Sequence, residues 1–365
     1  MRLGYDLLFM VPGESGGRET YSRELLHALR ATLPDLHVTA FLNRETAAAG
    51  PGWWSDLTDR AVALPRVSAR NQARWALGET VAVARAAAAA DVEVLHCPAN
   101  FGPAAGPFAR VVTLHDLMYR RQPDLVSKVA RLGTDAVLVP AAKRAHRVIT
   151  ATAVSRAEIV DELGIDRERI EVIPHGVHPP PQRTARPVDT GGRRLVLAVG
   201  TNVPHKHHEG LLQGLARLED RPLLAIAGHG TEALQARATE LGVAGDVRLY
   251  GAVDRDTLED LYAAADSYVT ATRHEGFGLP VIEAMSRGVP VAASDIPVLR
   301  EVAGELATWF DTDDAESVAR ALQPLPDRRA AGRARAASYT WAATAGLTAA
   351  TYADAVSTMT KTRLV

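Results

Sequence analysis

Apolar and polar positions alternate along the chain in blocks that predict strands followed by helices. Apolar runs of four to six residues are typical of buried strands, and longer stretches with apolar residues three and four apart are typical of helices. In the first half this pattern predicts strands at 7–11, 37–42, 92–97, 111–114, 147–151 and 170–173, and helices at 17–32, 72–90, 126–145 and 155–163. Such an order predicts a parallel sheet with helical crossovers.

The second half repeats the alternation after a break in composition. Residues 178–192 are rich in proline and glycine, which continue neither helices nor strands, and we interpret this stretch as a linker. Strands are then predicted at 195–200, 223–227, 247–250, 267–271 and 291–293. The pattern therefore predicts an α/β protein of two Rossmann-like domains, residues 1–180 and 190–344. Ligands of such sheets bind beyond the carboxyl ends of the strands, so two facing domains would share a central cleft.

Composition narrows the class of protein without identifying it. With 365 residues the chain is too long for one typical core and fits two domains. Lysine and arginine number 41 against 43 acidic residues, a net charge of -2 that gives no reason to expect a nucleic-acid partner. Cys97 is the only cysteine, which excludes an internal disulfide and suits a reducing cytoplasm. We see no cleavage pattern of a signal peptide and no apolar run long enough to span a bilayer, so we expect a cytoplasmic protein.

The most informative stretch is residues 275–283, Glu-Gly-Phe-Gly-Leu-Pro-Val-Ile-Glu. Gly276 and Gly278 allow the backbone to come close to a ligand. Pro280 suits the first position of a helix, whose positive N-terminal end favours an anion such as a phosphate. Glu275 can accept hydrogen bonds from sugar hydroxyls, and Glu283 offers two acceptor oxygens to the paired hydroxyls of a ribose. The alternative interpretation is an acidic helix cap with a solvated partner.

Two glutamates with seven residues between them, followed by Ala-Met-Ser-Arg-Gly-Val-Pro-Val, resemble the motif of the retaining glycosyltransferases of family 4. The resemblance implies the GT-B glycosyltransferase fold, in which the first domain receives the acceptor and the second binds a nucleotide sugar. It also implies that a last helix, about 345–365, returns to the first domain.

Two further matches fall in the first half. Gly16 and Gly17 form a glycine-rich turn between the first strand and a helix, although the turn lacks the GxGxxG spacing of a dinucleotide site. In the family this pair lets the backbone approach the donor diphosphate and the acceptor; the alternative is an ordinary strand-to-helix turn. His115 follows a buried strand, and by resemblance it contacts the donor sugar near the reacting carbon. The alternative is a histidine that caps the strand.

Lys206 follows the first strand of the second domain. By resemblance it meets the diphosphate, where its charge can neutralise the leaving group. Many relatives also carry an arginine shortly after the strand glycine, and this chain has Thr201 and Asn202 there instead. The predicted catalytic residues are thus His115, Glu275 and Lys206, and the predicted donor-binding residues are Gly16, Gly17, Gly276, Phe277, Gly278, Leu279 and Glu283.

No metal site and no cofactor are predicted. His205, His207 and His208 surround Lys206, but no carboxylate or thiolate completes a ligand set, and the lysine would repel a cation. The Asp-x-Asp pairs at 254–256 and 311–313 have the spacing of metal-dependent sugar transferases of another fold. Both precede predicted helices, so we interpret them as helix caps.

The resemblance therefore implies transfer of a hexosyl unit, with retained configuration, from GDP-mannose or a UDP-sugar to an acceptor hydroxyl, and we expect a metal-independent front-face mechanism. The acceptor is left open among a glycan, a lipid intermediate and a secondary metabolite. The alternatives are an epimerase or a phosphorolytic enzyme on the same fold, and a non-catalytic sugar-nucleotide sensor. Arg120, Arg121, Lys128 and Arg131 form a basic stretch that suits an anionic acceptor or a peripheral contact with the inner membrane face; a solvated helix face is the alternative.

Overall fold

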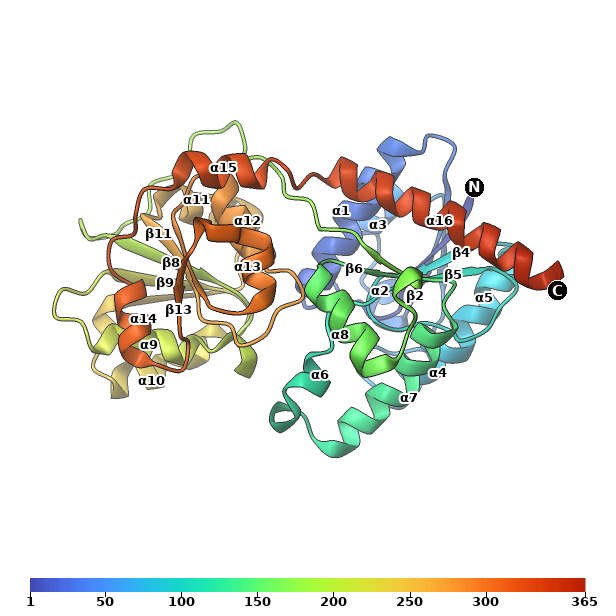
Figure 1. Cartoon of the computed structure of the whole chain (residues 1–365), viewed down its shortest axis with the longest axis horizontal. Helices are drawn as coiled ribbons and strands as arrows, with labels where there is room; N and C mark the ends of the chain where they lie inside the picture. Colours follow the sequence, from blue (N-terminus) through green and yellow to red (C-terminus); the bar gives the residue numbers. More distant parts are fainter. Residues whose placement is uncertain (365) are drawn as a thin grey trace. The chain divides into compact units, whose positions relative to one another are not determined.

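The computed structural model describes residues 1–364 and separates into two compact units. The first unit comprises Met1–Gly176 and the chain from Trp341 onward, and the second is Val177–Thr340. The chain therefore passes between the units twice. Each unit has a parallel sheet flanked by helices, the architecture expected from the alternating pattern (Figure 1).

The first unit has seven parallel strands in the order β3-β2-β1-β4-β5-β6-β7. Its strands are β1 (Arg2–Leu7), β2 (His37–Leu42), β3 (Arg60–Ala63), β4 (Val94–Cys97), β5 (Ala109–Thr113), β6 (Arg147–Thr150) and β7 (Ile170–Val172). Its α-helices are α1 (Gly17–Thr32), α2 (Arg44–Ala48), α3 (Trp53–Leu57), α4 (Gln72–Leu77), α5 (Val83–Ala89), α6 (Met118–Arg121), α7 (Lys128–Arg144), α8 (Ala153–Leu163) and α16 (Trp341–Leu364).

Several details of the first unit differ from the prediction, and the short helices α2, α3 and α6 were not predicted. The first strand ends at Leu7, so the prediction of a strand over 7–11 was wrong; Leu8 instead donates its N–H to the Asp6 carboxylate, 2.9 Å away, and begins a turn. Strand β3 was not predicted because it is a short edge strand that stays largely exposed and has no apolar run. The predicted helix 72–90 is interrupted by a π-helical turn, Gly78–Ala82, where a Cβ on Gly78 would lie 2.4 Å from Val67.

The second unit has six parallel strands in the order β10-β9-β8-β11-β12-β13. They are β8 (Leu195–Val199), β9 (Leu223–Ala227), β10 (Val247–Gly251), β11 (Ser267–Thr270), β12 (Val291–Ser294) and β13 (Thr308–Phe310). The α-helices are α9 (His208–Ala216), α10 (Gln235–Glu240), α11 (Arg255–Ala264), α12 (Leu279–Ser286), α13 (Pro297–Ala303), α14 (Ala315–Ala321) and α15 (Arg329–Ala336). Strand β13 was not predicted, since its three residues are too few for a pattern.

The proline-rich segment 178–192 belongs to the second unit, which begins at Val177 rather than at the predicted residue 190. Arg183 and Arg186 of this segment donate to the carboxylate of Asp260 on α11, at 2.7 and 2.6 Å. The segment therefore packs against the rest of the second unit although its sequence predicts no helix or strand.

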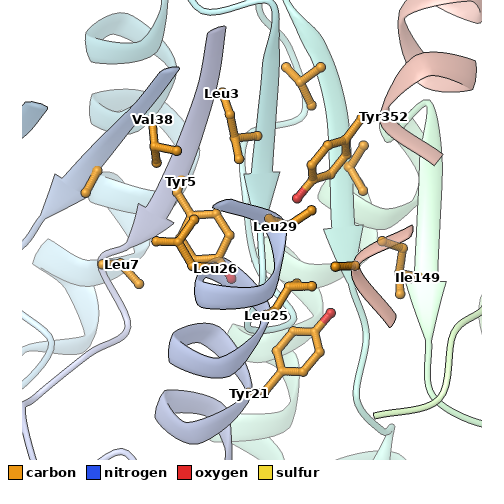
Figure 2. Close-up of a cluster of buried hydrophobic side chains, with 14 of the residues drawn as sticks. Leu3, Tyr5, Leu7, Tyr21, Leu25, Leu26, Leu29, Val38, Ile149 and Tyr352 are labelled. Carbon is orange, nitrogen blue, oxygen red and sulfur yellow. The ribbon is translucent and has the colours of Figure 1, made fainter. Parts of the chain in front are cut away.

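One hydrophobic cluster of the first unit forms where α1 and α16 cover the sheet. Leu25, Leu26 and Leu29, spaced as the helical pattern requires, are fully buried beside Tyr5 of β1 (Figure 2). Tyr352 places α16 in the same cluster, although the helix lies at the far end of the sequence. Among the described helices, none combines the length and the apolar character needed to cross a bilayer.

We expect Leu25→Ala to destabilise the first unit by about 2–5 kcal/mol, because Leu25 is completely buried and the substitution leaves a cavity. Urea unfolding followed by tryptophan fluorescence measures the change. Leu347→Ala on α16 is the control, since this leucine is 50% exposed, and its effect should stay within about 0.5 kcal/mol. Equal effects of the two substitutions would contradict the packing described here.

Candidate functional site

Lys206 and Glu275, two of the predicted catalytic residues, form an ion pair. Lys206 ends a 3-10 turn, Pro204–Lys206, after β8, and Glu275 lies in the loop after β11. The Lys206 ammonium donates to Oε1 of Glu275, and the two side chains are 18% and 15% exposed. The loops are also joined through the backbone, because Arg273 donates its N–H to the His205 carbonyl at 2.7 Å. Neighbouring parallel strands thus bring together side chains that are far apart in the sequence.

The glycine-rich turn continues from Glu275 into α12. Gly278 precedes the helix with φ of 87°, and a Cβ there would come within 2.5 Å of Leu299, so only glycine fits. Phe277 is buried and packs edge-to-face on Tyr339, with ring centroids 5.6 Å apart. The helix begins at Leu279, so Pro280 occupies its second position rather than the predicted first. The turn is therefore anchored by Phe277 and bent at Gly278.

Glu283 of α12 accepts a hydrogen bond at Oε2 from the Tyr262 hydroxyl, 3.1 Å away. Burial raises the pKa of Glu283, while the charge of Arg287 and the hydrogen bond from Tyr262 act in the opposite direction. Burial and then the charges of Glu275 and Glu283 raise the pKa of Tyr268 on β11, so both motif carboxylates act on the same ring. The charges of both motif glutamates therefore act on Tyr268.

Tyr262 and the buried pair Arg287–Glu259 are parts of the site that sequence reasoning missed. The Arg287 guanidinium donates to both carboxylate oxygens of Glu259, and the side chains are only 7% and 8% exposed. Arg287 stood in the motif string without an assigned role. Tyr262 lies on α11, outside the motif, and no residue spacing connects that helix with Glu283.

Backbone contacts fasten the neighbouring loops of the second unit together. A Cβ on Gly228 would lie 2.0 Å from the Gly200 carbonyl oxygen, so the loops after β8 and β9 can touch only with glycine at 228. Asn202 donates its N–H to the His229 carbonyl at 2.9 Å and its side-chain N–H to the Gly230 carbonyl at 3.1 Å. Asn202 therefore joins the loop after β8 to the loop after β9.

The histidines beside Lys206 have other protein side chains as neighbours. His207 Nε2 lies 3.2 Å from Arg273, whose guanidinium is paired with Asp313 at 2.5 Å. Burial and the nearby charge of Lys206 lower the pKa of His208 to about 4. In the part of the chain that the structure describes, no three His, Cys, Asp or Glu side chains come together to hold a metal ion.

The helix-cap interpretation of the Asp-x-Asp pairs is confirmed for one of them. Asp254 caps α11 by accepting the Thr257 N–H at 2.7 Å. The interpretation was wrong for 311–313, because the cap of α14 is Asp314, which accepts the Glu316 N–H at 3.0 Å. Asp313 pairs with Arg273 instead.

In the first unit, His115 follows β5 and its ring is held in a defined orientation. Its Nε2 lies 2.7 Å from the carbonyl oxygen of Pro98, and because a carbonyl can only accept, the proton is on Nε2 and Nδ1 is the acceptor. The backbone N–H donates to Asn100 at 2.7 Å, and the ring meets Tyr21 edge-on with centroids 4.9 Å apart. Burial lowers the pKa of His115 to about 4, so the ring is neutral at pH 7.

A buried chain of hydrogen bonds supports Tyr21 from the C-terminal helix. The Tyr21 hydroxyl lies 3.2 Å from the Thr113 hydroxyl, which lies 2.8 Å from Nε2 of His96. Nδ1 of His96 lies 2.7 Å from the hydroxyl of Tyr352 on α16, and Figure 2 shows both tyrosines in the same cluster. Burial lowers the pKa of His96 to about 3, so the chain contains a neutral imidazole. Helix α16 thus takes part in positioning the aromatic side chain on which His115 rests.

The Gly16–Gly17 turn begins α1 without a side-chain cap. Gly16 has φ of 58° and Gly17 is the first helical residue. A Cβ on Gly17 would meet no atom within 4 Å, so the turn leaves room beside the helix start. Arg18 extends from the same turn over the ring of Phe9, 5.6 Å from its centroid. Open space suits the predicted approach of a ligand to this turn, and the assignment of Gly16 and Gly17 to the donor stays a prediction.

Comparisons with known proteins agree with this architecture. The family model for glycosyltransferase family 4 matches residues 15–179, and that for glycosyl transferases group 1 matches residues 184–339. O-antigen chain mannosyltransferase B of Escherichia coli is 31% identical over 256 residues, which are 63% of this chain and 66% of that protein. The structure resembles sucrose-phosphate synthase from Thermosynechococcus elongatus, with a TM-score of 0.76 at 21% identity over 96% of this chain and 98% of the other. It also resembles Anabaena HepE in complex with UDP and glucose, with a TM-score of 0.74 at 17% identity over 96% and 99% of the two chains.

One family model matches the first part of the chain, residues 15–179, and the other matches the second, residues 184–339, and the solved structures resemble the chain over 96% of its length. The chain therefore belongs to the glycosyltransferases of family 4 type, with the GT-B fold of two Rossmann-like domains. The match spans slightly less than two thirds of the length of the Escherichia coli relative.

We expect the stability of the protein to fall as the pH decreases from about 6.5 toward 4. The pKa values of His96 and His115 lie near 3 and 4 in the folded chain, whereas an unfolded histidine has a pKa of about 6.5. Between these values the unfolded chain binds more protons than the folded chain. Each of the two histidines therefore lowers the free energy of unfolding by up to about 1.4 kcal/mol per pH unit as the pH falls.

Unfolding free energies measured at several pH values test this expectation. His115→Asn should reduce the pH slope by about one proton, and Leu347→Ala, which removes no titratable group, should leave the slope unchanged. A slope unaffected by His115→Asn would show that His115 is not held neutral by burial.

Proposed function

We propose that this protein transfers a hexosyl unit from a nucleoside diphosphate sugar to an acceptor hydroxyl, with retention of configuration and without a metal ion. The observation that carries the proposal is the Lys206–Glu275 ion pair at the carboxyl ends of β8 and β11, with Glu283 in the same motif as Glu275. It combines a cation for a diphosphate with carboxylates for sugar hydroxyls. Both are needed by an enzyme that activates a sugar through its leaving group.

Each side chain of the pair has a separate task. The Lys206 ammonium neutralises charge that gathers on the departing diphosphate, and Glu275 accepts hydrogen bonds from hydroxyls of the transferred sugar. Their contact holds both groups in place before the donor binds, so little reorganisation is required. Glu283 accepts from the ribose hydroxyls. His115 offers Nδ1 as an acceptor to the donor sugar, an assignment that rests on the family resemblance.

Retention follows from a front-face reaction in this proposal. The bond from the anomeric carbon to the phosphate oxygen breaks, and the bond to the acceptor oxygen forms on the same face of the sugar. The proton of the acceptor hydroxyl passes to the departing diphosphate, so neither a nucleophilic carboxylate nor a separate base is required. The residues of the site then act by stabilising charge and by positioning.

The donor is proposed as GDP-mannose or a UDP-sugar. The Escherichia coli relative is named a mannosyltransferase, and HepE was solved with UDP and glucose. An epimerase would convert the donor without an acceptor, a phosphorolytic enzyme would depend on inorganic phosphate, and a sensor would release no diphosphate. Measuring nucleoside diphosphate release with and without glycan, lipid or small-molecule acceptors separates these alternatives.

We predict that Glu275→Ala and Lys206→Ala each lower turnover by a factor of about 100 or more while the fold is retained. A thermal-shift panel of UDP-, GDP-, ADP- and TDP-sugars identifies the donor, because a bound ligand raises the melting temperature. Diphosphate release with that donor then measures turnover.

The matched control is Arg217→Ala, which removes an exposed ion pair with Glu316 in the same unit. This variant should keep normal turnover, since exposed pairs contribute little. Near-normal turnover in both site variants would contradict the assignment of Glu275 and Lys206.

We also propose that the start of α7 contacts an anionic lipid surface. Val129 and Leu132 are 82% and 67% exposed, and since they stand three residues apart they share one face of the helix. Leu125 just before the helix is 39% exposed. Lys128 and Arg131 lie in the same turn and supply positive charge. Exposed apolar side chains flanked by basic ones suit the interface of an anionic bilayer, where a lipid acceptor would be presented.

The other two residues of the predicted basic stretch have protein partners. Arg120 pairs with Asp135 at 2.7 Å, and Arg121 lies 3.6 Å from Glu158. The charge available to a lipid headgroup is therefore concentrated at the start of α7.

Flotation with vesicles tests this surface. We expect binding to vesicles that contain phosphatidylglycerol, weaker binding at high salt, and weak binding to pure phosphatidylcholine. Val129→Asp combined with Leu132→Asp should reduce binding at least tenfold, whereas Leu347→Asp, at another exposed leucine, should not. Equal binding of the two variants would contradict the proposed surface, and concentration-dependent dimers lost only in the double variant would identify it as a self-contact.

A further inference from the structure

The carboxylate of Glu283 is oriented by a residue to which the proposed function gives no role. Tyr262 reaches it from α11, with the hydroxyl 3.1 Å from Oε2 of Glu283 and 3.4 Å from the Pro280 carbonyl oxygen. A phenol has a single proton, and the charged, nearer acceptor takes it. The tyrosine is only 1% exposed, so its ring holds the hydroxyl at a fixed position.

Arg287 fixes the ring and the helix at the same time. Its guanidinium lies 5.3 Å from the centroid of the Tyr262 ring and donates to both oxygens of Glu259. A further N–H is 3.2 Å from the carbonyl oxygens of His178 and Glu283. These contacts tie α11, the end of α12 and the first residues of the second unit together around the tyrosine. Tyr262 therefore has little freedom to move away from Glu283.

The hydrogen bond from Tyr262 decides which acceptor positions Glu283 can offer. A carboxylate has two oxygens with about four lone-pair positions. Donation to Oε2 uses one position and stops rotation of the group, which leaves Oε1 and the other side of Oε2 for a ligand. Two neighbouring acceptor oxygens match two neighbouring hydroxyls, as on a ribose. Without the hydroxyl at residue 262 the carboxylate could rotate out of this alignment.

We propose that Tyr262 is a positioning residue for ribose recognition, which orients Glu283 so that its two oxygens meet the 2′ and 3′ hydroxyls of the donor nucleotide. The inference rests on the proposed function, in which Glu283 binds the ribose. It makes the hydroxyl at residue 262 a determinant of preference for ribonucleotides over deoxyribonucleotides.

Tyr262 also favours the ionised form of Glu283. The titratable and charged groups that face Glu283 are Arg287 at the end of α12, Tyr262, Glu259 and Arg255 on α11, and Tyr268 on β11. Burial raises the pKa of Glu283, and a hydrogen bond donated to the carboxylate lowers it. Loss of the Tyr262 hydroxyl therefore raises the pKa further. The ionised carboxylate accepts from both hydroxyls, so nucleotide affinity falls when Glu283 becomes protonated. Without the Tyr262 hydroxyl this protonation, and the loss of affinity with it, should occur at a higher pH.

Calorimetry with the wild type and three variants tests the inference. The probe is whichever of UDP, GDP and ADP raises the melting temperature most, together with its 2′-deoxy counterpart. We expect Tyr262→Phe to weaken the ribonucleotide about tenfold and the deoxynucleotide by less than about threefold. The fall in affinity between pH 8 and pH 5.5 should begin at a higher pH in this variant.

Two further variants make the outcome decisive. Glu283→Gln should weaken the ribonucleotide at least as much as Tyr262→Phe. Tyr5→Phe removes another buried tyrosine hydroxyl, which donates to the Ser22 carbonyl oxygen at 3.2 Å in the first unit, and it should leave nucleotide affinity unchanged. This control separates the loss of a buried hydroxyl from the loss of ribose alignment.

Each result supports or overturns a distinct statement. If Glu283→Gln weakens binding and Tyr262→Phe does not, the role of Tyr262 is wrong while the proposed function stands. If Tyr262→Phe weakens the two nucleotides equally, the residue affects packing and not the ribose. If the wild type binds none of the ribonucleotides, or if Glu283→Gln binds them normally, the donor assignment of Glu283 fails and the inference fails with it.

Discussion

The ion pair between Lys206 and Glu275 forms because β8 and β11 are neighbours in a parallel sheet. In such a sheet all strands end at the same edge, so the loops that follow them meet although 69 residues separate the two side chains. The backbone bond from Arg273 to His205 fixes the same loops independently of charge. The candidate site therefore depends on strand order first and on the chemistry of its side chains second.

Glycine is required at two places where these loops approach each other. Gly228 lets the loop after β9 touch the Gly200 carbonyl, and Gly278 turns the chain into α12 beside Leu299. A side chain at either position would separate groups that have to converge. The small residues of this edge thus serve close packing of the backbone.

Burial controls the electrostatics of both units. It lowers the pKa values of His96 and His115, which stay neutral at pH 7 and serve as hydrogen-bonding groups. It raises the pKa of Glu283, and the hydrogen bond from Tyr262 and the charge of Arg287 oppose that shift. The aromatic and polar neighbours of each site residue therefore determine its protonation as much as its residue type does. Tyr262 lies on α11, an element that the motif does not include.

Sequence patterns predicted much of the architecture because each strand and helix leaves a local record in the spacing of apolar residues. The predictions of α1, β2 and β9 agree with the observed bounds. The family resemblance placed Glu275 and Glu283 in one motif. The edge strands β3 and β13 were missed, because short or exposed strands carry no apolar run. Residues 178–192 contain no helix or strand, yet Arg183 and Arg186 pack through charge, which hydrophobic patterning does not record.

The sequence by itself determined the two parallel sheets, the glycine turns and the residue types of the candidate site, because these depend on local spacing and on motif chemistry. Only the tertiary structure decided that Lys206 contacts Glu275, that Tyr262 and Arg287 hold Glu283, and that Tyr352 supports the cluster under His115. Such contacts join residues from distant elements, and their partners are chosen by strand order and helix packing. No pattern along a single chain expresses that choice.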